Sequence, residues 1–208
     1  MSREGNVYFI SAKGKAYISI EPLVDPKLKV MEIVNAYNTR QRELLRARLA
    51  EMPPQQFEQL ISQLLEAMGY EDVIVTKESG DKGVDVIATV QFGITTITEV
   101  VQVKRHQSNI SRPVLDQLRG ALPYHNALRG TLITLGNFSN GCTKAALFPG
   151  AAPITLINGD KLLDLLMEHE IGIQKRPVTL YELEEDFLKY EEKTEQDDPV
   201  SDEGDKYR

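Results

Sequence analysis

The sequence predicts an α/β protein with a three-layer core, in which a central mixed β-sheet is flanked by helices. Apolar residues recur at helical spacing before residue 69, and three strand-like runs follow between residues 72 and 104. Strands and helices then alternate up to residue 169. Such alternation requires parallel crossovers, whose helices cover both faces of a sheet. The expected order is therefore αβββαβ plus a further αβα.

Apolar stripes and prolines mark the helices of the first half. The spacing predicts a helix over residues 27–50, and Pro53-Pro54 ends it and opens the next helix, because proline suits a first turn. The second helix is expected to run to about Met68, with Gly69 as its stop. Its apolar stripe consists of Phe57, Leu60, Ile61, Leu64, Leu65 and Met68.

Three strands are expected next. They cover residues 72–76, 84–90 and 95–104, and Phe92-Gly93 marks a tight turn between the last two.

The second half alternates between helices and short apolar strands. Ser111 can cap a helix over 113–125, and Ser139 can cap a short helix that runs to Leu147. The β-branched and apolar runs at 130–135 and 153–157 are typical of buried parallel strands. Asn158-Gly159 is expected to turn into a last core helix over 161–169, and an amphipathic segment follows at 180–190.

Composition excludes several classes of protein. The chain has 208 residues, 41% of them hydrophobic, and a mean hydropathy of −0.30, which fit a globular protein of one domain with an appendage. No apolar run approaches the ~20 residues that span a membrane, and the first residues lack the apolar core of a signal peptide. The single Cys142 excludes an internal disulfide and a cysteine-based zinc site. We expect a cytoplasmic protein without membrane association.

The net charge of −7 is unevenly distributed. Residues 181–208 hold twelve acidic and four basic residues, which leaves 19 acidic and 20 basic residues in 1–180. The body is therefore near neutral, and the acidity belongs to the tail. Tails of this kind are usually disordered and solvating, and some compete with nucleic acid for a basic groove.

Polar residues interrupt two of the predicted strands. Asp85 lies in GDKGVDVIA (80–88), and Gln102 and Lys104 lie in QVKRH (102–106), each among valines. Buried charges of this kind cost several kcal/mol, as an order of magnitude, unless they are paired or bind a metal. Side chains two apart on a strand share a face, so Gln102 and Lys104 are expected together, and a neighbouring strand can bring Asp85 beside them. A carboxylate, an amide and an ammonium are suited to hold a divalent cation against a phosphate.

These motifs, taken in order, resemble the Mrr-like catalytic domain, a branch of the PD-(D/E)XK nuclease superfamily. Six stretches between residues 53 and 166 carry the resemblance: PPQQFEQLISQLLEAMGY, GDKGVDVIA, QVKRH, LDQLRG, GTLIT and LINGDKLLDLL. The resemblance implies a restriction-endonuclease-like core and a Mg²⁺-dependent DNA endonuclease that hydrolyses phosphodiester bonds. The branch consists mostly of restriction enzymes, including modification-dependent ones, so a phage-defence role is expected.

The resemblance also assigns roles to residues. Asp85 corresponds to the metal-binding carboxylate and Lys104 to the catalytic lysine that stabilises charge on the phosphate or positions water. Gln102 stands where glutamate is more usual, and it can ligate Mg²⁺ or orient a water without adding charge. Glu58, on the first core helix, is the candidate for a further ligand. The expected catalytic residues are thus Asp85, Gln102, Lys104 and Glu58. The expected metal ligands are Asp85, Gln102 and Glu58, and Mn²⁺ is expected to substitute for Mg²⁺.

Structural readings of the same residues remain open. Asp85 and Lys104 could form a buried ion pair, Lys104 could extend to solvent, and Glu58 could be an exposed helix residue. Asp81 is expected to cap a turn, with a second-metal role as the alternative. A phosphate-contacting rim is expected from nearby basic residues, for which a solvated surface role is the alternative. They are Lys82, Arg105, His106, Arg112 and Arg119.

The domain organisation follows from the extent of the resemblance. Residues 1–50 are expected to form a β-rich segment and a helix, either a winged-helix remnant, because SAKGKAYI (11–18) resembles a wing, or a dimerisation element. Residues 51–180 are expected to form the endonuclease domain, and residues 181–208 an acidic, disordered tail. One domain of this size usually cuts one strand, so the expected partners are double-stranded DNA and a second copy of the chain, at least on DNA.

Two other functions fit the same core. One is a structure-specific nuclease, such as a Holliday-junction resolvase, which would cut branched DNA irrespective of methylation. The other is a catalytically inactive nuclease fold that serves as a DNA-binding module, against which the Asp85, Gln102 and Lys104 set argues.

Overall fold

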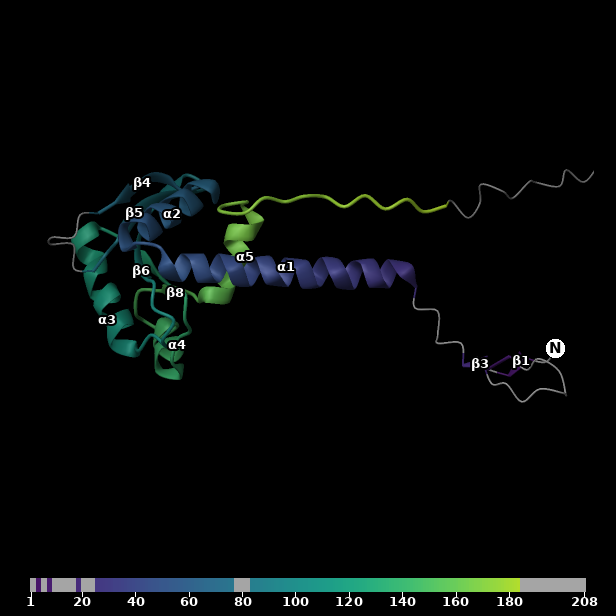
Figure 1. Cartoon of the computed structure of the whole chain (residues 1–208). Helices are drawn as coiled ribbons and strands as arrows, with labels where there is room; N and C mark the ends of the chain where they lie inside the picture. The colour runs from purple at the N-terminus through teal and green to yellow at the C-terminus, as the bar shows by residue number, and fades with distance from the viewer. Residues whose placement is uncertain (1–2, 5–6, 9–17, 20–24, 77–82, 184–208) are drawn as a thin grey trace, which may run out of the picture. The chain divides into compact units, whose positions relative to one another are not determined.

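A computed structural model describes residues 3–4, 7–8, 18–19, 25–76 and 83–183. Its centre is a five-stranded sheet in the order β4-β5-β6-β7-β8 (Figure 1). The strands are β4 (Glu71–Val75), β5 (Val86–Phe92), β6 (Thr95–Lys104), β7 (Arg129–Thr134) and β8 (Ile154–Ile157). Pairing is antiparallel from β4 to β6 and parallel from β6 to β8. The predicted mixed sheet is confirmed.

Helices cover both faces of this sheet. They are α1 (Pro26–Glu51), α2 (Pro54–Ala67), α3 (Arg112–Ala121), α4 (Asn140–Ala146) and α5 (Gly159–Glu168), with a 3₁₀ turn at Leu122–His125. Side chains of α1, α2 and α5 form one apolar core with Val86, Val101 and Val103. Side chains of α3 and α4 form a second core on the other face, with Val100 and Leu132. Strands β5 to β8 thus contribute residues to both cores, and β4 packs against the first core alone. Apolar cores on both faces of the sheet confirm the three-layer class.

Capping residues and prolines explain where most of the helices begin and end. The Ser139 hydroxyl accepts a hydrogen bond from the Cys142 amide (3.2 Å), as predicted for the cap of α4. Ser111 occupies the cap position of α3 but makes no capping hydrogen bond there. The helix predicted over 113–125 ends at Ala121 and continues as the 3₁₀ turn, because Pro123 lacks the amide hydrogen that an α-helix needs.

The N-terminal residues form a small separate sheet. Its strands are β1 (Arg3–Glu4), β2 (Val7–Tyr8) and β3 (Ile18–Ser19), which pair antiparallel in that order. Val7 lies in β2 and Ile18 in β3, whereas residues 11–17 of the wing-like segment fall outside the described residues.

The chain divides into two compact units after Lys175. In the second unit, residues 176–183 form no helix or strand, so the described start of the predicted amphipathic segment is irregular. The rest of that segment, and the acidic tail from residue 184, fall outside the described residues. Among the described helices, none combines the length and apolar character that a bilayer crossing requires.

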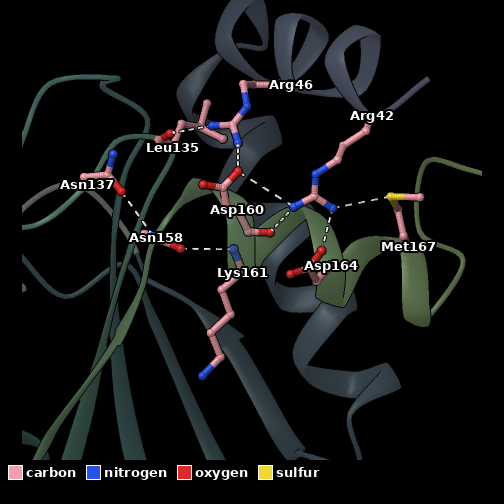
Figure 2. Close-up of polar contacts among 9 residues, drawn as sticks. All are labelled: Arg42, Arg46, Leu135, Asn137, Asn158, Asp160, Lys161, Asp164 and Met167. Atoms are coloured by element: carbon pink, nitrogen blue, oxygen red, sulfur yellow. Dashed lines mark hydrogen bonds and ion pairs between the residues drawn. The ribbon is translucent and has the colours of Figure 1, made fainter. Parts of the chain in front are cut away.

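Two arginines attach α1 to α5 (Figure 2). Arg42 pairs with Asp164 (2.5 Å) and donates to the Asp160 carbonyl (2.7 Å). Arg46 pairs with Asp160 (2.6 Å) and donates to the Leu135 carbonyl at the end of β7 (3.1 Å). These contacts lie in the second half of α1, where Leu45 and Leu49 are also buried, whereas Leu28, Met31, Ile33 and Tyr37 in the first half are exposed. The second half of α1 therefore belongs to the core.

The sheet contains one buried carboxylate that the sequence pattern did not reveal. Glu99, on β6, is only 2% exposed. It accepts hydrogen bonds from Arg129 Nε (2.6 Å), the Tyr70 hydroxyl (3.0 Å) and the Thr131 hydroxyl. Because β6 and β7 pair Glu99 with Arg129, the network joins the middle of the sheet to the end of α2.

This network predicts an asymmetric stability effect. Arg129→Met leaves Glu99 buried without its cation and is expected to lower the free energy of unfolding by about 3 kcal/mol. Arg40→Met removes an exposed pair with Glu43 (3.9 Å) and is expected to cost less than about 0.5 kcal/mol. Urea unfolding of the two variants tests this, and equal losses would contradict the account.

Candidate active site

The site forms where β5 begins and β6 ends. Because these strands are antiparallel, the start of one lies beside the end of the other. Asp85 immediately precedes β5, and Lys104 is the last residue of β6. The first turns of α2 lie against the same edge. A cleft of about 210 Å³ opens there, lined by Pro54, Phe57, Glu58, Asp85, Val103, Lys104, Arg105 and His106. Two acidic and three basic side chains therefore share one cleft.

Hydrogen bonds fix Asp85 on both sides. Its amide donates to the Val101 carbonyl on β6 (2.9 Å), and its carbonyl accepts from the Thr76 amide beyond β4 (3.0 Å). Its carboxylate Oδ2 accepts from the Val103 amide (2.6 Å). The side-chain oxygen thus accepts the kind of hydrogen bond that a main-chain carbonyl accepts in regular strand pairing. This bond fixes the orientation of one carboxylate oxygen of Asp85 in the site.

The environment of Asp85 disfavours its charge. Burial raises the pKa of this carboxyl above its ordinary value, and the hydrogen bond from Val103 and the charge of Lys104 oppose that rise only in part. A carboxylate whose negative charge is only partly compensated by its surroundings is common at sites that bind a cation. The alternative of a simple buried ion pair with Lys104 is weakened, because no Asp85–Lys104 pair within salt-bridge distance occurs among the described residues.

Gln102 differs from the expectation. It is 1% exposed and is not among the residues that line the cleft, although it is two residues from Lys104. The Oε1 atom of Gln102 is buried and has no hydrogen-bond partner within the described part of the chain. Among the buried side-chain oxygens and nitrogens of the described residues, it stands alone in this respect. A buried acceptor without a donor is costly. A cation, or a water bound to one, would satisfy it, so the donor set fits a divalent metal.

The remaining predicted rim residues are divided. Arg105 lines the cleft and also donates to the Met52 carbonyl, which ties the end of β6 to the α1–α2 connection. His106 lines the cleft and is exposed. Lys82 and Asp81 lie outside the described residues.

Two arginines on α3 lie elsewhere than expected. Arg112 pairs with Asp116 on the helix surface (3.1 Å). Arg119 donates to the carbonyls of Ala152 (2.9 Å) and Ala145 (2.7 Å), so its guanidinium joins α3 to the end of α4. Neither residue lines the cleft.

The cleft contains few of the His, Cys, Asp and Glu side chains that usually bind metal ions. Within the described residues there is no group of three or more His, Cys, Asp or Glu side chains placed to hold a metal ion. Glu58 and Asp85 are the two carboxylates in the cleft, and an amide would have to supply a third side-chain oxygen. Pro54 and Phe57 form part of the wall and were not foreseen, although their motif, which also holds Glu58, was recognised.

The fold and this cleft define a restriction-endonuclease-like protein. Its structural neighbours are the MspJI restriction endonuclease in complex with an oligonucleotide (TM-score 0.51, 23% identity, 61% of this chain and 30% of that one) and the DNA modification-dependent restriction endonuclease AspBHI (TM-score 0.53, 17%, 65% and 36%). At these identities the likeness establishes the fold.

The sequence comparisons establish the family. The family model of the Mrr catalytic domain, described as a restriction endonuclease, matches residues 49–166. The chain belongs to this restriction endonuclease family, which makes it a nuclease domain. It is also 30% identical over 145 residues to the type IV methyl-directed restriction enzyme EcoKMrr of Escherichia coli K12, covering 67% of this chain and 46% of the relative. The chain thus spans less than half of that relative's length.

The pKa of Asp85 predicts a pH-dependent stability change. Because the pKa is raised by folding, the folded protein binds more protons than the unfolded chain above the ordinary value of 3.8, and Asp85 lowers stability as pH rises through its folded pKa. Asp85→Asn keeps an acceptor for Val103 and should stabilise the metal-free protein at pH 7, because the buried group then carries no charge. Urea unfolding from pH 7 to pH 3.5 tests this; the gain should vanish at the acid end, and a pH-independent gain would contradict it.

Proposed function

We propose that this protein is a Mg²⁺-dependent endonuclease that hydrolyses phosphodiester bonds of double-stranded DNA, of the restriction or phage-defence type. The observation that carries the proposal is the cleft that Asp85, Glu58 and Lys104 share in a chain of the restriction endonuclease family. Restriction endonucleases as a family use divalent metal ions and act on DNA.

The roles of the residues follow from their chemistry. Asp85, Glu58 and the Gln102 Oε1 would hold Mg²⁺ or Mn²⁺, which prefer oxygen ligands. When bound, the metal supplies charge neutralisation at the phosphate and lowers the pKa of a water. Lys104 adds a point charge toward the phosphate oxygens that become more negative in the transition state. Arg105 and His106, at the rim, orient the DNA backbone through its phosphates.

The substrate class is proposed from the relatives. A methyl-directed enzyme and a modification-dependent enzyme are among the proteins that this chain resembles. We propose modified DNA as the preferred substrate, cut in the cytoplasm. One cleft serves one strand, so cleavage of both strands requires two copies of the chain, at least transiently on DNA.

The catalytic set predicts a sharp loss of activity. Asp85→Ala should abolish Mg²⁺-dependent cleavage, and Lys104→Ala should reduce its rate by about 10²–10³-fold, because a positioned charge in the site is lost. Plasmid cleavage, methylated and unmethylated, with and without Mg²⁺, measures both. Gln63→Ala, an exposed glutamine on α2 outside the cleft, is the control that retains full activity. Metal-dependent cleavage at the wild-type rate by both site variants would refute the proposal, and a preference for branched DNA irrespective of methylation would favour the resolvase alternative.

Gln102→Glu tests the neutral position in the site. The added carboxylate should lower the Mg²⁺ concentration needed for half-maximal cleavage, because two ligand charges become three. The same change should destabilise the metal-free protein, since position 102 is buried. Titration of the cleavage rate with Mg²⁺, together with thermal unfolding without metal, measures both effects, and an unchanged Mg²⁺ requirement would exclude residue 102 from the metal environment.

A further inference from the structure

The side chain of Thr134 joins the two loops that leave the sheet at the active-site edge. Thr134 is the last residue of β7, is fully buried, and lies opposite Lys104 in the parallel pairing of β6 with β7. Its hydroxyl donates a hydrogen bond to the His106 carbonyl (3.1 Å) and accepts one from the Gly136 amide (3.1 Å). One hydroxyl therefore serves as donor to the chain after β6 and as acceptor from the chain after β7.

The loop that follows β6 also packs against Gly136. A Cβ atom added there would come within 2.6 Å of the carbonyl oxygens of Gln107 and Ser108, so main chain lies directly on main chain. This contact begins one residue beyond His106. Thr134 acts at His106 itself, which lines the cleft and is exposed. The hydroxyl therefore holds the loop at the point where it borders the cleft.

The other basic residues of the cleft are held by different contacts. The Lys104 carbonyl accepts a hydrogen bond from the Leu135 amide (3.4 Å), which does not involve the Thr134 side chain. The Arg105 guanidinium is tied to the α1–α2 connection. Loss of the Thr134 hydroxyl should therefore disturb His106 more than Lys104 or Arg105.

We propose that Thr134 is a positioning residue, whose hydroxyl fixes the main chain at His106 and thereby the direction in which the His106 side chain meets the DNA backbone. The proposal rests on the proposed function, in which His106 belongs to the rim that contacts DNA phosphates. Loss of the hydroxyl should weaken DNA binding and leave the chemical step, which depends on Asp85 and Lys104, nearly unchanged. A higher KM at constant kcat is the sign of such a loss.

Two substitutions separate the hydroxyl from the rest of the side chain. Thr134→Val removes the hydroxyl, and Thr134→Ser keeps it. DNA affinity is measured by fluorescence anisotropy without metal, and KM and kcat by cleavage of a labelled duplex with Mg²⁺. We expect Thr134→Val to raise Kd and KM roughly 5-fold, about the effect of one hydrogen bond, with little change in kcat. Thr134→Ser should restore both constants, and a serine variant as weak as the valine variant would contradict the proposal.

Thr131→Val is the matched control. Thr131 is also a buried threonine of β7, but its hydroxyl donates to Glu99 and it does not line the cleft. This variant loses a buried hydrogen bond as well, so thermal unfolding should show a lower stability while Kd and KM for DNA stay at their wild-type values. An equal loss of DNA affinity in the two valine variants would mean a general structural effect and would overturn the proposal.

The His106→Ala background tests whether the effect passes through the His106 side chain. In that background Thr134→Val should weaken DNA binding no further, because the side chain that it positions is gone, and additive losses would overturn the proposal. The ¹H–¹⁵N NMR signals of the His106 imidazole report its position without DNA. Thr134→Val should shift them, and unchanged signals would also overturn the proposal. Absence of metal-dependent cleavage by the wild-type protein would instead refute the proposed function, and the NMR comparison would still decide whether Thr134 positions His106.

Discussion

The hydrogen bond from the Val103 amide to the Asp85 carboxylate is the interaction on which the site depends. It joins the start of β5 to the end of β6 at the point where their regular pairing stops at Val86 and Val101. The same bond orients one oxygen of Asp85 and holds the main chain that leads to Lys104. Residues of both strands also pack in the two apolar cores, so the packing of the sheet supports the site.

A shortage of negative charge shapes the chemistry of this cleft. Two carboxylates face three basic side chains, and the residue that could supply a third ligand oxygen is a neutral, buried amide. The raised pKa of Asp85 adds to the shortage by favouring the protonated form. Such a site should bind a divalent cation weakly by itself. The phosphates of DNA, which bring both charge and oxygen ligands, would complete it, so metal and substrate are expected to bind cooperatively.

Much of the fold could be predicted from residue patterns. The strand over 95–104 and the helix that follows Pro53 were placed almost to the residue, since proline, glycine and apolar spacing act locally. The end of α3 at Ala121, shortly before Pro123, was missed because apolar residues on both sides of the proline continue the helical pattern.

The residues of the site could be predicted from the sequence, but how deeply each side chain is buried could not. Alternation along β6 places Gln102 and Lys104 on one face. The strand ends at Lys104, however, so the lysine reaches the cleft, while the Gln102 side chain stays buried close to Gly83. Glu99 was missed for a related reason. Its partners Tyr70, Arg129 and Thr131 come from other elements, and pairing between distant segments leaves no local signal.

The most direct test of the central claim is to locate the cation. Small amounts of Mn²⁺ added to ¹⁵N-labelled protein broaden the amide signals nearest to the bound ion. The account predicts selective broadening at Asp85, Val103 and Lys104, with the hairpin at Phe92 and Gly93 unaffected at the other end of the strands. Broadening centred elsewhere, or an unchanged pattern in Asp85→Ala, would contradict a metal site in this cleft.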